Sequence, residues 1–265
     1  MERGLAEHKA CISGLAPLAN SRPNVRVRGM VGQPQIIAMG GGGFSMEPEN
    51  LSLDRYVLSA SGKPAPKVCF VPTASGDAQS YIDRFYDSLR TLPCIPTHLS
   101  LFKPPVMNLR SFVLEQDVIY VGGGNTRNLM ALWREWGLDE ILREAWQRGI
   151  VLAGLSAGSL CWFEEGVSDS VKTGELHPIA CLGFLRGSHC PHYDGEPERR
   201  PTYHRLLQQG ALPPGYAADD GAALHFLGTE PVKAVCSRPS ARVYRVRWTG
   251  TQIEEIALEM QLLCN

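Results

Sequence analysis

The chain has 265 residues, of which 44% are hydrophobic, and its formal net charge at pH 7 is −1. This length and composition are enough for one large α/β domain with a sizeable core. The balanced charge argues against a nucleic-acid or anionic-membrane partner, since either would favour a basic face. No apolar stretch approaches the roughly 20 residues needed to cross a bilayer.

The eight cysteines are scattered through apolar segments, and none belongs to a CxxC pair. We interpret them as small buried hydrophobic side chains in a reducing cytosol, rather than as a disulfide framework. The spacing typical of zinc ligands is also absent. The sequence therefore predicts a cytoplasmic protein without a bound metal or cofactor.

Residues 1–30 differ from the rest of the chain. They mix polar residues with prolines and lack a basic stretch followed by a long apolar one, so they do not resemble a signal peptide. We expect a peripheral or poorly ordered arm over residues 1–30, followed by a single domain over residues 31–265. Met30 could be the natural start of the protein.

The first predicted strand covers residues 35–39 and leads into four consecutive glycines, Gly40 to Gly43. This run lacks the lysine and the serine or threonine of a P-loop, and it lacks the GxGxxG spacing. We therefore expect close approach of the backbone to a site or to a neighbouring loop, rather than a nucleotide-binding loop.

Strands and helices alternate through the next hundred residues. Further strands are predicted at residues 67–72, 97–102 and 118–121. Asp77 is expected to cap a helix that runs to about Leu92, and Asp139 to cap another after the fourth strand. This alternation predicts parallel βαβ units, in which ligands bind outside the carboxyl ends of the strands.

The fourth strand ends in a glycine-rich loop, Gly122 to Thr126. Glycines at such a position can turn their N–H groups into a cleft without obstruction by side chains. The helix that follows has an apolar stripe with Trp133 on its buried face, which we assign to the core. The loop itself could still be a plain strand-to-helix connection.

The segment Gly154 to Gly158 follows an apolar run, residues 150–153, and precedes a predicted helix that ends near Glu164. Strand, tight turn with a serine, and helix form the layout of a nucleophile elbow. Such a turn lifts the Ser156 hydroxyl off the strand and places the Ala157 N–H where it can stabilise an oxyanion. The pentapeptide alone is equally compatible with a small-residue turn that has no chemistry.

The last third of the chain is predicted to contain several short strands. A loop is expected over residues 166–169, a strand over 182–188, a helix around 203–209, two strands over 215–218 and 222–226, and a hairpin within 232–258. Thr249 and Gly250 should form the hairpin turn. Exposed apolar surface on this hairpin could form a homodimer contact.

Four segments give the chain a resemblance to a known family. They are VGGGNT at residues 121–126, GLSAGS at 154–159, PHYD at 191–194 and DDG at 219–221. In this order they resemble peptidase E, a serine exopeptidase family with cyanophycinase-like members. The resemblance implies an open, mainly parallel, doubly wound α/β sheet in three layers, like a class I glutamine amidotransferase. Those enzymes have a cysteine at the elbow, whereas this chain has a serine.

The resemblance also implies roles for the catalytic residues. Ser156 corresponds to the nucleophile and His192 to the general base. Asp169 corresponds best to the acid that orients the histidine, although the flanking residues match only in part, and Asp220 is the second candidate.

Further family positions concern the oxyanion and the substrate. The backbone N–H groups of Gly124 and Ala157 correspond to the oxyanion donors. Gly123 and Asn125 are expected to face the substrate. Arg199, or Arg200 if the alignment has a gap, would select an N-terminal aspartate. An ion pair of Arg199 with a neighbouring glutamate is the competing interpretation.

These assignments predict a serine exopeptidase or dipeptidase that cleaves short peptides through an acyl-enzyme, with a preference for an N-terminal aspartate implied by the family. Two alternatives remain open at this stage. One is a cyanophycinase-like hydrolase of β-linked aspartyl-arginine, although the sequence has no clear acidic cluster for the arginine. The other is a binding protein that kept the fold without turnover.

Overall fold

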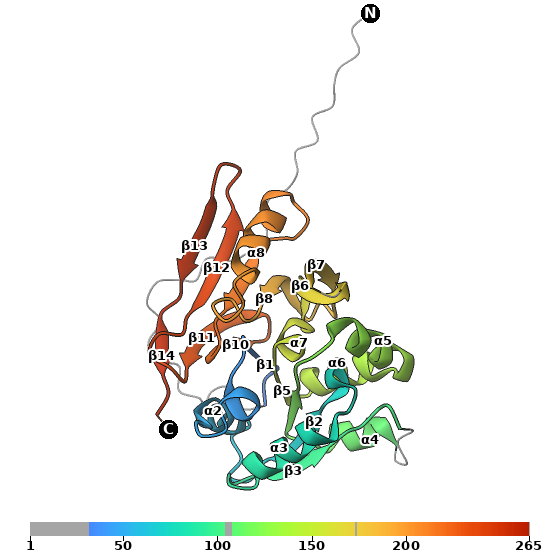
Figure 1. Ribbon diagram of the computed structural model, residues 1–265. Coiled ribbons are helices and arrows are strands. Elements are labelled where there is room, and N and C mark those ends of the chain that lie inside the picture. The colour runs from blue at the N-terminus through green and yellow to red at the C-terminus, as the bar shows by residue number, and fades with distance from the viewer. Residues whose placement is uncertain (1–31, 104–107, 173, 265) are drawn as a thin grey trace, which may run out of the picture.

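Two β-sheets organise the chain (Figure 1). The computed structural model describes residues 32–103, 108–172 and 174–264. The arm expected over residues 1–30 lies outside the described residues.

The larger sheet has eight strands in the order β14-β11-β10-β1-β5-β4-β2-β3. Its strands are β1 (Gln35–Met39), β2 (Lys67–Val71), β3 (Ile95–His98), β4 (Val118–Val121), β5 (Val151–Leu155), β10 (Ala222–Leu227), β11 (Glu230–Cys236) and β14 (Met260–Leu262). From β1 to β3 all neighbouring strands are parallel, whereas β10 is antiparallel to both β1 and β11. The predicted open, mainly parallel sheet is therefore confirmed.

Helices cover both faces of this sheet (Figure 1). They are α1 (Gly43–Met46), α2 (Ser52–Ala60), η2 (Thr73–Ser75), α3 (Gln79–Leu89), α4 (Leu109–Leu114), α5 (Thr126–Trp136), α6 (Leu138–Gln147) and α7 (Ala157–Leu160). Helix α8 (Arg199–Gln208) packs on the second sheet instead. Ile36 of β1 belongs to the core that contains Trp133 of α5, whereas the adjacent Ile37 belongs to the core that contains Phe85 of α3. Alternate residues of one strand thus bury against opposite helical layers, which confirms the doubly wound, three-layer architecture.

The second sheet has six strands in the order β13-β12-β9-β8-β6-β7. They are β6 (Phe163–Lys172), β7 (Glu175–Ala180), β8 (Leu185–Cys190), β9 (Gly215–Ala218), β12 (Val243–Trp248) and β13 (Ile253–Ala257). Strands β6, β8 and β9 are parallel neighbours. The expected hairpin is β12–β13, at the upper left of Figure 1, and Thr249 lies in its turn with its N–H bonded to the Gln252 carbonyl at 3.0 Å.

The predicted elements after the elbow were wrong in two respects. Helix α7 ends at Leu160 rather than near Glu164, and residues 166–169 belong to strand β6 rather than to a loop. Trp162 and Phe163 are fully buried, and Phe163 pairs with Leu185 of β8. Large aromatic side chains favour a pleated, buried strand, and here the chain enters the second sheet at Phe163, where β6 begins.

Both predicted aspartate caps were also wrong. Asp77 adopts a positive φ of 54°, and its Oδ2 accepts the N–H groups of Leu101 at 2.7 Å and Phe102 at 2.9 Å. The third strand accordingly ends at His98, before these residues. Helix α6 starts after Gly137, whose left-handed φ of 64° also ends α5, so Asp139 lies within the first turn.

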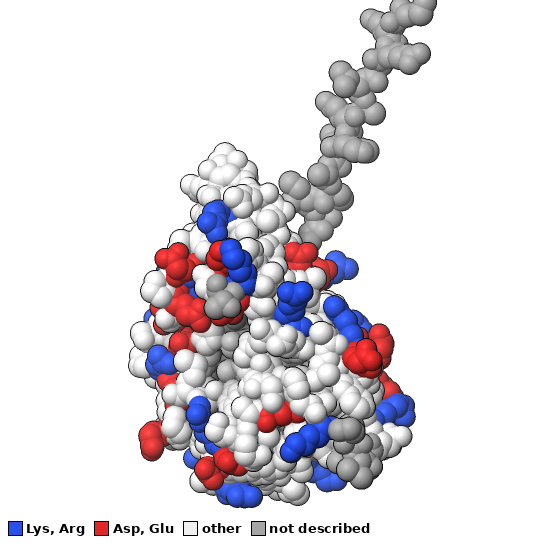
Figure 2. Space-filling model, turned by 45° about the vertical axis from the view of Figure 1, so that its right-hand side comes forward, with Lys and Arg blue, Asp and Glu red and all other residues white. Residues whose placement is uncertain are grey.

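The seven described cysteines are all free, and Cys69, Cys161, Cys190 and Cys236 are buried. Among the described residues, no helix is both long and apolar enough to cross a membrane. Figure 2 shows lysine and arginine interspersed with aspartate and glutamate on one face of the molecule, separated by uncharged surface.

Asp54 of α2 is a fully buried carboxyl group that holds α1 in place. Its Oδ2 accepts the Phe44 N–H at 2.9 Å, and its Oδ1 accepts the Tyr120 hydroxyl at 3.0 Å. Burial raises the pKa of Asp54 to about 7, because the charged form loses its hydration.

We expect the buried Asp54 to make stability depend on pH. The folded chain keeps the Asp54 proton up to about pH 7, whereas a free aspartate releases its proton near 3.8. Between these values the folded state binds more protons, so the free energy of unfolding falls as pH rises. From about pH 5 to about pH 7.5, wild type should lose roughly 2–3 kcal/mol more than Asp54→Asn in urea denaturation. Parallel losses in the two proteins would contradict this origin.

Candidate active site

The carboxyl ends of three strands of the larger sheet meet at one edge. Met39 at the end of β1 pairs with Leu155 at the end of β5, and Val121 at the end of β4 pairs with Gly154. The loops that follow these strands are therefore neighbours. They contain the glycine run after β1, the glycine-rich loop after β4, and Ser156.

Ser156 occupies a strained turn between β5 and α7. Its φ of 55° and ψ of −120° lie in a region that residues with a side chain rarely adopt. A Cβ on Gly154 would lie 2.2 Å from the Gly158 carbonyl oxygen, and one on Gly158 would lie 2.2 Å from that of Val121. Both glycines are thus required by the packing of the turn, as a nucleophile elbow demands.

The histidine and its partner come from the second sheet. His192 follows β8, and Asp220 follows β9, the parallel neighbour of β8. The Nδ1 of His192 lies 2.6 Å from Oδ1 of Asp220, and the two side chains are only 13% and 12% exposed. A carboxylate can only accept this bond, so Nδ1 carries the proton and Nε2 is left as the basic nitrogen.

Glycine backbone encloses the Asp220 carboxylate. A Cβ on Gly41 would lie 2.1 Å from Oδ1 of Asp220, and a Cβ on Gly195 would lie 2.3 Å from Oδ2. The Gly221 N–H donates to the Gly41 carbonyl at 3.0 Å, and the Asp220 N–H donates to Asp194 at 2.8 Å. The expected close backbone approach at the first glycine run is thus confirmed, with the Asp220 loop as its partner.

A pocket of about 250 Å³ lies between the loops of the larger sheet and His192, which follows β8 of the second sheet. It is lined by Ser45, Met46, Tyr81, Arg84, Gly123, Gly124, Leu155, Ser156 and His192. A Cβ on Gly123 would lie 3.1 Å from the Cβ of Ser156, so any side chain there would crowd the serine. Ala157 directly follows this serine as the first residue of α7, so its N–H has no partner within the helix.

Three residues expected at the site, Asp169, Asn125 and Arg199, do not line this pocket. Asp169 is exposed on β6, and the hydrogen bond of His192 goes to Asp220 instead. Asn125 is the N-cap of α5, where its Oδ1 accepts the Asn128 N–H at 2.9 Å.

Arg199 is 5% exposed and does not line the pocket. Its Nε donates to Glu196 at 2.6 Å and its Nη1 to the Val167 carbonyl at 2.9 Å. The ion pair with a neighbouring glutamate, the competing interpretation of this arginine, is therefore the one present.

Sequence reasoning missed one wall of the pocket, formed by Ser45 and Met46 of α1 and by Tyr81 and Arg84 of α3. The Tyr81 hydroxyl accepts the Gly123 N–H at 3.2 Å, which ties α3 to the loop beside Ser156. The usable signal was position, because the first turns of a helix that follows a parallel strand lie near the ligand-binding edge of the sheet.

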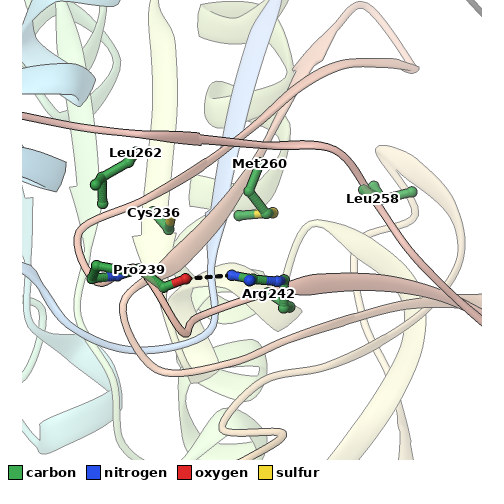
Figure 3. Close-up of a pocket in the computed structure, with 6 residues that line it drawn as sticks. All are labelled: Cys236, Pro239, Arg242, Leu258, Met260 and Leu262. Atoms are coloured by element: carbon green, nitrogen blue, oxygen red, sulfur yellow. Dashed lines mark hydrogen bonds between the residues drawn. The ribbon is translucent and has the colours of Figure 1, made fainter.

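Another pocket, of about 270 Å³, lies near the C-terminal strand and is lined by Cys236, Pro239, Arg242, Leu258, Met260 and Leu262 (Figure 3). The Arg242 Nη1 donates to the Pro239 carbonyl at 2.6 Å. Burial raises the pKa of the Cys236 thiol, so this cysteine stays protonated and is a poor nucleophile. Of these two pockets, only the one with Ser156 contains both a hydroxyl group and an imidazole in its lining.

A serine on a strained turn, a histidine paired with a carboxylate, and glycine backbone beside the serine form the arrangement used by hydrolases with a nucleophilic serine. The profile of peptidase family S51 matches residues 36–233. This match covers most of the chain, and the chain belongs to peptidase family S51.

Individual relatives agree with this assignment. The uncharacterized peptidase YgaJ of Bacillus subtilis (strain 168) is 62% identical over 229 residues, which cover 86% of this chain and 99% of that protein. A peptidase from an acI-B1 actinobacterium shares the fold with a TM-score of 0.61 at 18% identity, over 85% of this chain and 96% of that one. A candidate peptidase E from Listeria monocytogenes EGD-e gives a TM-score of 0.57 at 18% identity, over 76% and 97%.

Gly41→Ala should displace the Asp220 carboxylate, because the added methyl group would lie 2.1 Å from its Oδ1. We expect kcat for peptide hydrolysis to fall by on the order of 10²-fold or more, since misplacing a group that positions the catalytic base by about 1 Å has this effect. Steady-state kinetics with a chromogenic peptide would measure it, and thermal unfolding would check the fold.

A double variant provides the control. In an Asp220→Asn background, Gly41→Ala should reduce the residual rate much less than in wild type, because the two changes act on the same contact. Independent, multiplicative losses would show that Gly41 acts through something other than Asp220.

Proposed function

We propose that this chain is a serine exopeptidase that cleaves short peptides through an acyl-enzyme formed on Ser156. One observation carries the proposal: the histidine that lines the pocket with Ser156 is held at 2.6 Å by a shielded carboxylate, Asp220. Membership of a peptidase family supports a peptide bond as the target.

In the first step, Ser156 Oγ attacks the carbonyl carbon of the scissile bond while His192 Nε2 takes the hydroxyl proton. The Asp220 carboxylate accepts the Nδ1–H bond, fixes this tautomer and stabilises the positive charge that develops on the imidazole. The tetrahedral intermediate then collapses as the C–N bond breaks. His192 returns its proton to the leaving amine, and an ester remains on Ser156.

The oxyanion of the tetrahedral intermediate would be stabilised by the N–H groups of Gly124 and Ala157. Gly124 lines the pocket and Ala157 directly follows Ser156. Each such donor contributes roughly 3–4 kcal/mol in comparable sites. Water then attacks the ester carbonyl, His192 again takes and returns a proton, and the acid product leaves.

The dimensions of the pocket favour short substrates. A volume of about 250 Å³ is below the roughly 300–1,000 Å³ of typical sites for drug-sized ligands. A space of this size holds one or two residues of a peptide. This supports an exopeptidase or dipeptidase.

The alternatives receive less support. A β-linked aspartyl-arginine substrate would call for an acidic group to bind the guanidinium, but the described residues that line the pocket include no aspartate or glutamate. A non-catalytic binding protein would not need Asp220 to be shielded by glycine backbone on two sides. Arg199, which the family resemblance linked to an aspartate preference, is engaged by Glu196 and does not support that preference.

Substitution of the two candidate acids distinguishes their roles. We expect Asp220→Asn to lower kcat by on the order of 10⁴-fold, because the amide favours the wrong tautomer of the catalytic histidine. Asp169→Asn, an isosteric change on the exposed face of β6, should leave kcat within about twofold, as surface changes usually do. Initial rates on a dipeptide panel would measure both variants.

Labelling by a fluorophosphonate tests the nucleophile independently of the substrate. Wild type and Asp169→Asn should be labelled, whereas Ser156→Ala should not, because the reagent phosphonylates an activated serine hydroxyl. Equal labelling of Ser156→Ala, or strong loss of activity in Asp169→Asn with a normal Asp220→Asn, would overturn the assignment.

A further inference from the structure

Arg84 supplies a positive charge at the wall of the pocket that contains Ser156. It lies on α3, three residues after Tyr81. Its Nη1 donates to the Ser45 carbonyl at 3.0 Å, and its guanidinium carbon lies 5.9 Å from the centre of the Tyr81 ring. Two contacts thus hold this exposed side chain against the pocket.

This guanidinium has no acidic partner within the described part of the chain. None of the salt bridges among the described residues includes Arg84. Arg199 and Arg238, in contrast, pair with Glu196 and Glu47. Since the described lining of the pocket also lacks aspartate and glutamate, Arg84 leaves the pocket with an uncompensated positive charge.

We propose that Arg84 binds a carboxylate of the peptide and thereby sets the specificity of the site. This inference rests on the proposed peptidase function. The planar guanidinium offers five N–H donors in a fork that matches a carboxylate. The Nη1 of Arg84 is already bonded to the Ser45 carbonyl, whereas Nε and Nη2 have no hydrogen bond to the described residues and can form a two-pronged contact with a carboxylate.

A short peptide can offer this carboxylate from two sources, an acidic side chain or the free C-terminus. Both have the same charge and geometry, so Arg84 would recognise either. The residue that selects the substrate is then Arg84 on α3, which reaches the pocket, and not Arg199, which is buried on α8. This role also explains why the cation is exposed, because it has to meet a ligand from solution.

Four dipeptides distinguish the two sources: Asp-Ala, Asn-Ala and the C-terminal amides of both. Each replacement of a carboxylate by an amide keeps the shape and removes the charge. With wild type, the carboxylate that Arg84 binds should raise kcat/KM by about 10- to 100-fold over its amide, the range expected for a charge-assisted contact. The Asp/Asn ratio reports a side-chain carboxylate, and the acid/amide ratio reports the C-terminus.

In Arg84→Gln, the ratio that is large in wild type should fall to within about threefold of one, and the comparison uses only the ratio of two substrates measured on the same variant. Arg84→Lys should keep part of the preference, because the charge remains and the fork is lost. Arg90→Gln is the matched control: Arg90 is also exposed on the end of α3, stacks on Tyr86 at 4.8 Å and does not line the pocket. It should retain the wild-type ratios.

The carboxylate assignment is overturned if wild type shows no carboxylate preference, if Arg84→Gln keeps it, or if Arg90→Gln loses it equally. In each of these cases hydrolysis itself continues, so the peptidase function stands. If wild type hydrolyses none of the four peptides and Ser156 is not labelled by a fluorophosphonate, the proposed function fails, and the inference fails with it.

Discussion

The hydrogen bond between His192 and Asp220 is the contact on which the rest of the site depends. It joins the loops after two neighbouring strands of the smaller sheet, and the same carboxylate touches Gly41, which follows β1 of the larger sheet. The bond therefore lies at the junction between the two sheets, with both partners on the smaller sheet and the larger sheet closing one side. Because the two side chains are almost fully shielded from water, the charge of Asp220 acts on the imidazole with little screening.

Close packing of backbone against backbone explains the small residues around this contact. At Gly154 and Gly158 a methyl group would collide with a carbonyl oxygen, and at Gly41 and Gly195 it would collide with Asp220. This close packing is accompanied by backbone strain at two residues that have side chains, because Ser156 and His192 both adopt a positive φ. Strained residues of this kind persist where surrounding packing over-determines them, and they cluster at functional sites.

The environment of each charged or titratable group separates structural from chemical roles. Burial lowers the pKa of His189 to about 3 and that of His225 to about 4, so both remain neutral and act as hydrogen-bonding members of the core. His189 bonds to the Ser159 hydroxyl, which in turn donates to the Ser156 carbonyl and braces the elbow. The buried Arg199 likewise has a structural role, because it ties the start of α8 to the Val167 carbonyl of β6. Arg84, in contrast, reaches the pocket without an acidic partner in the described chain.

The sequence by itself determined the parallel strands, because apolar runs such as residues 35–39 and 150–153 leave few alternatives, and it determined the turn at Ser156, because small residues at fixed spacing are a local requirement. Tertiary structure alone decided the second sheet, which depends on pairing between segments distant in the chain. It also decided that Asp220 rather than Asp169 meets His192, and that Arg84 rather than Arg199 faces the pocket. Such choices depend on which loops the two sheets bring together in space, and local pattern contains no information about that.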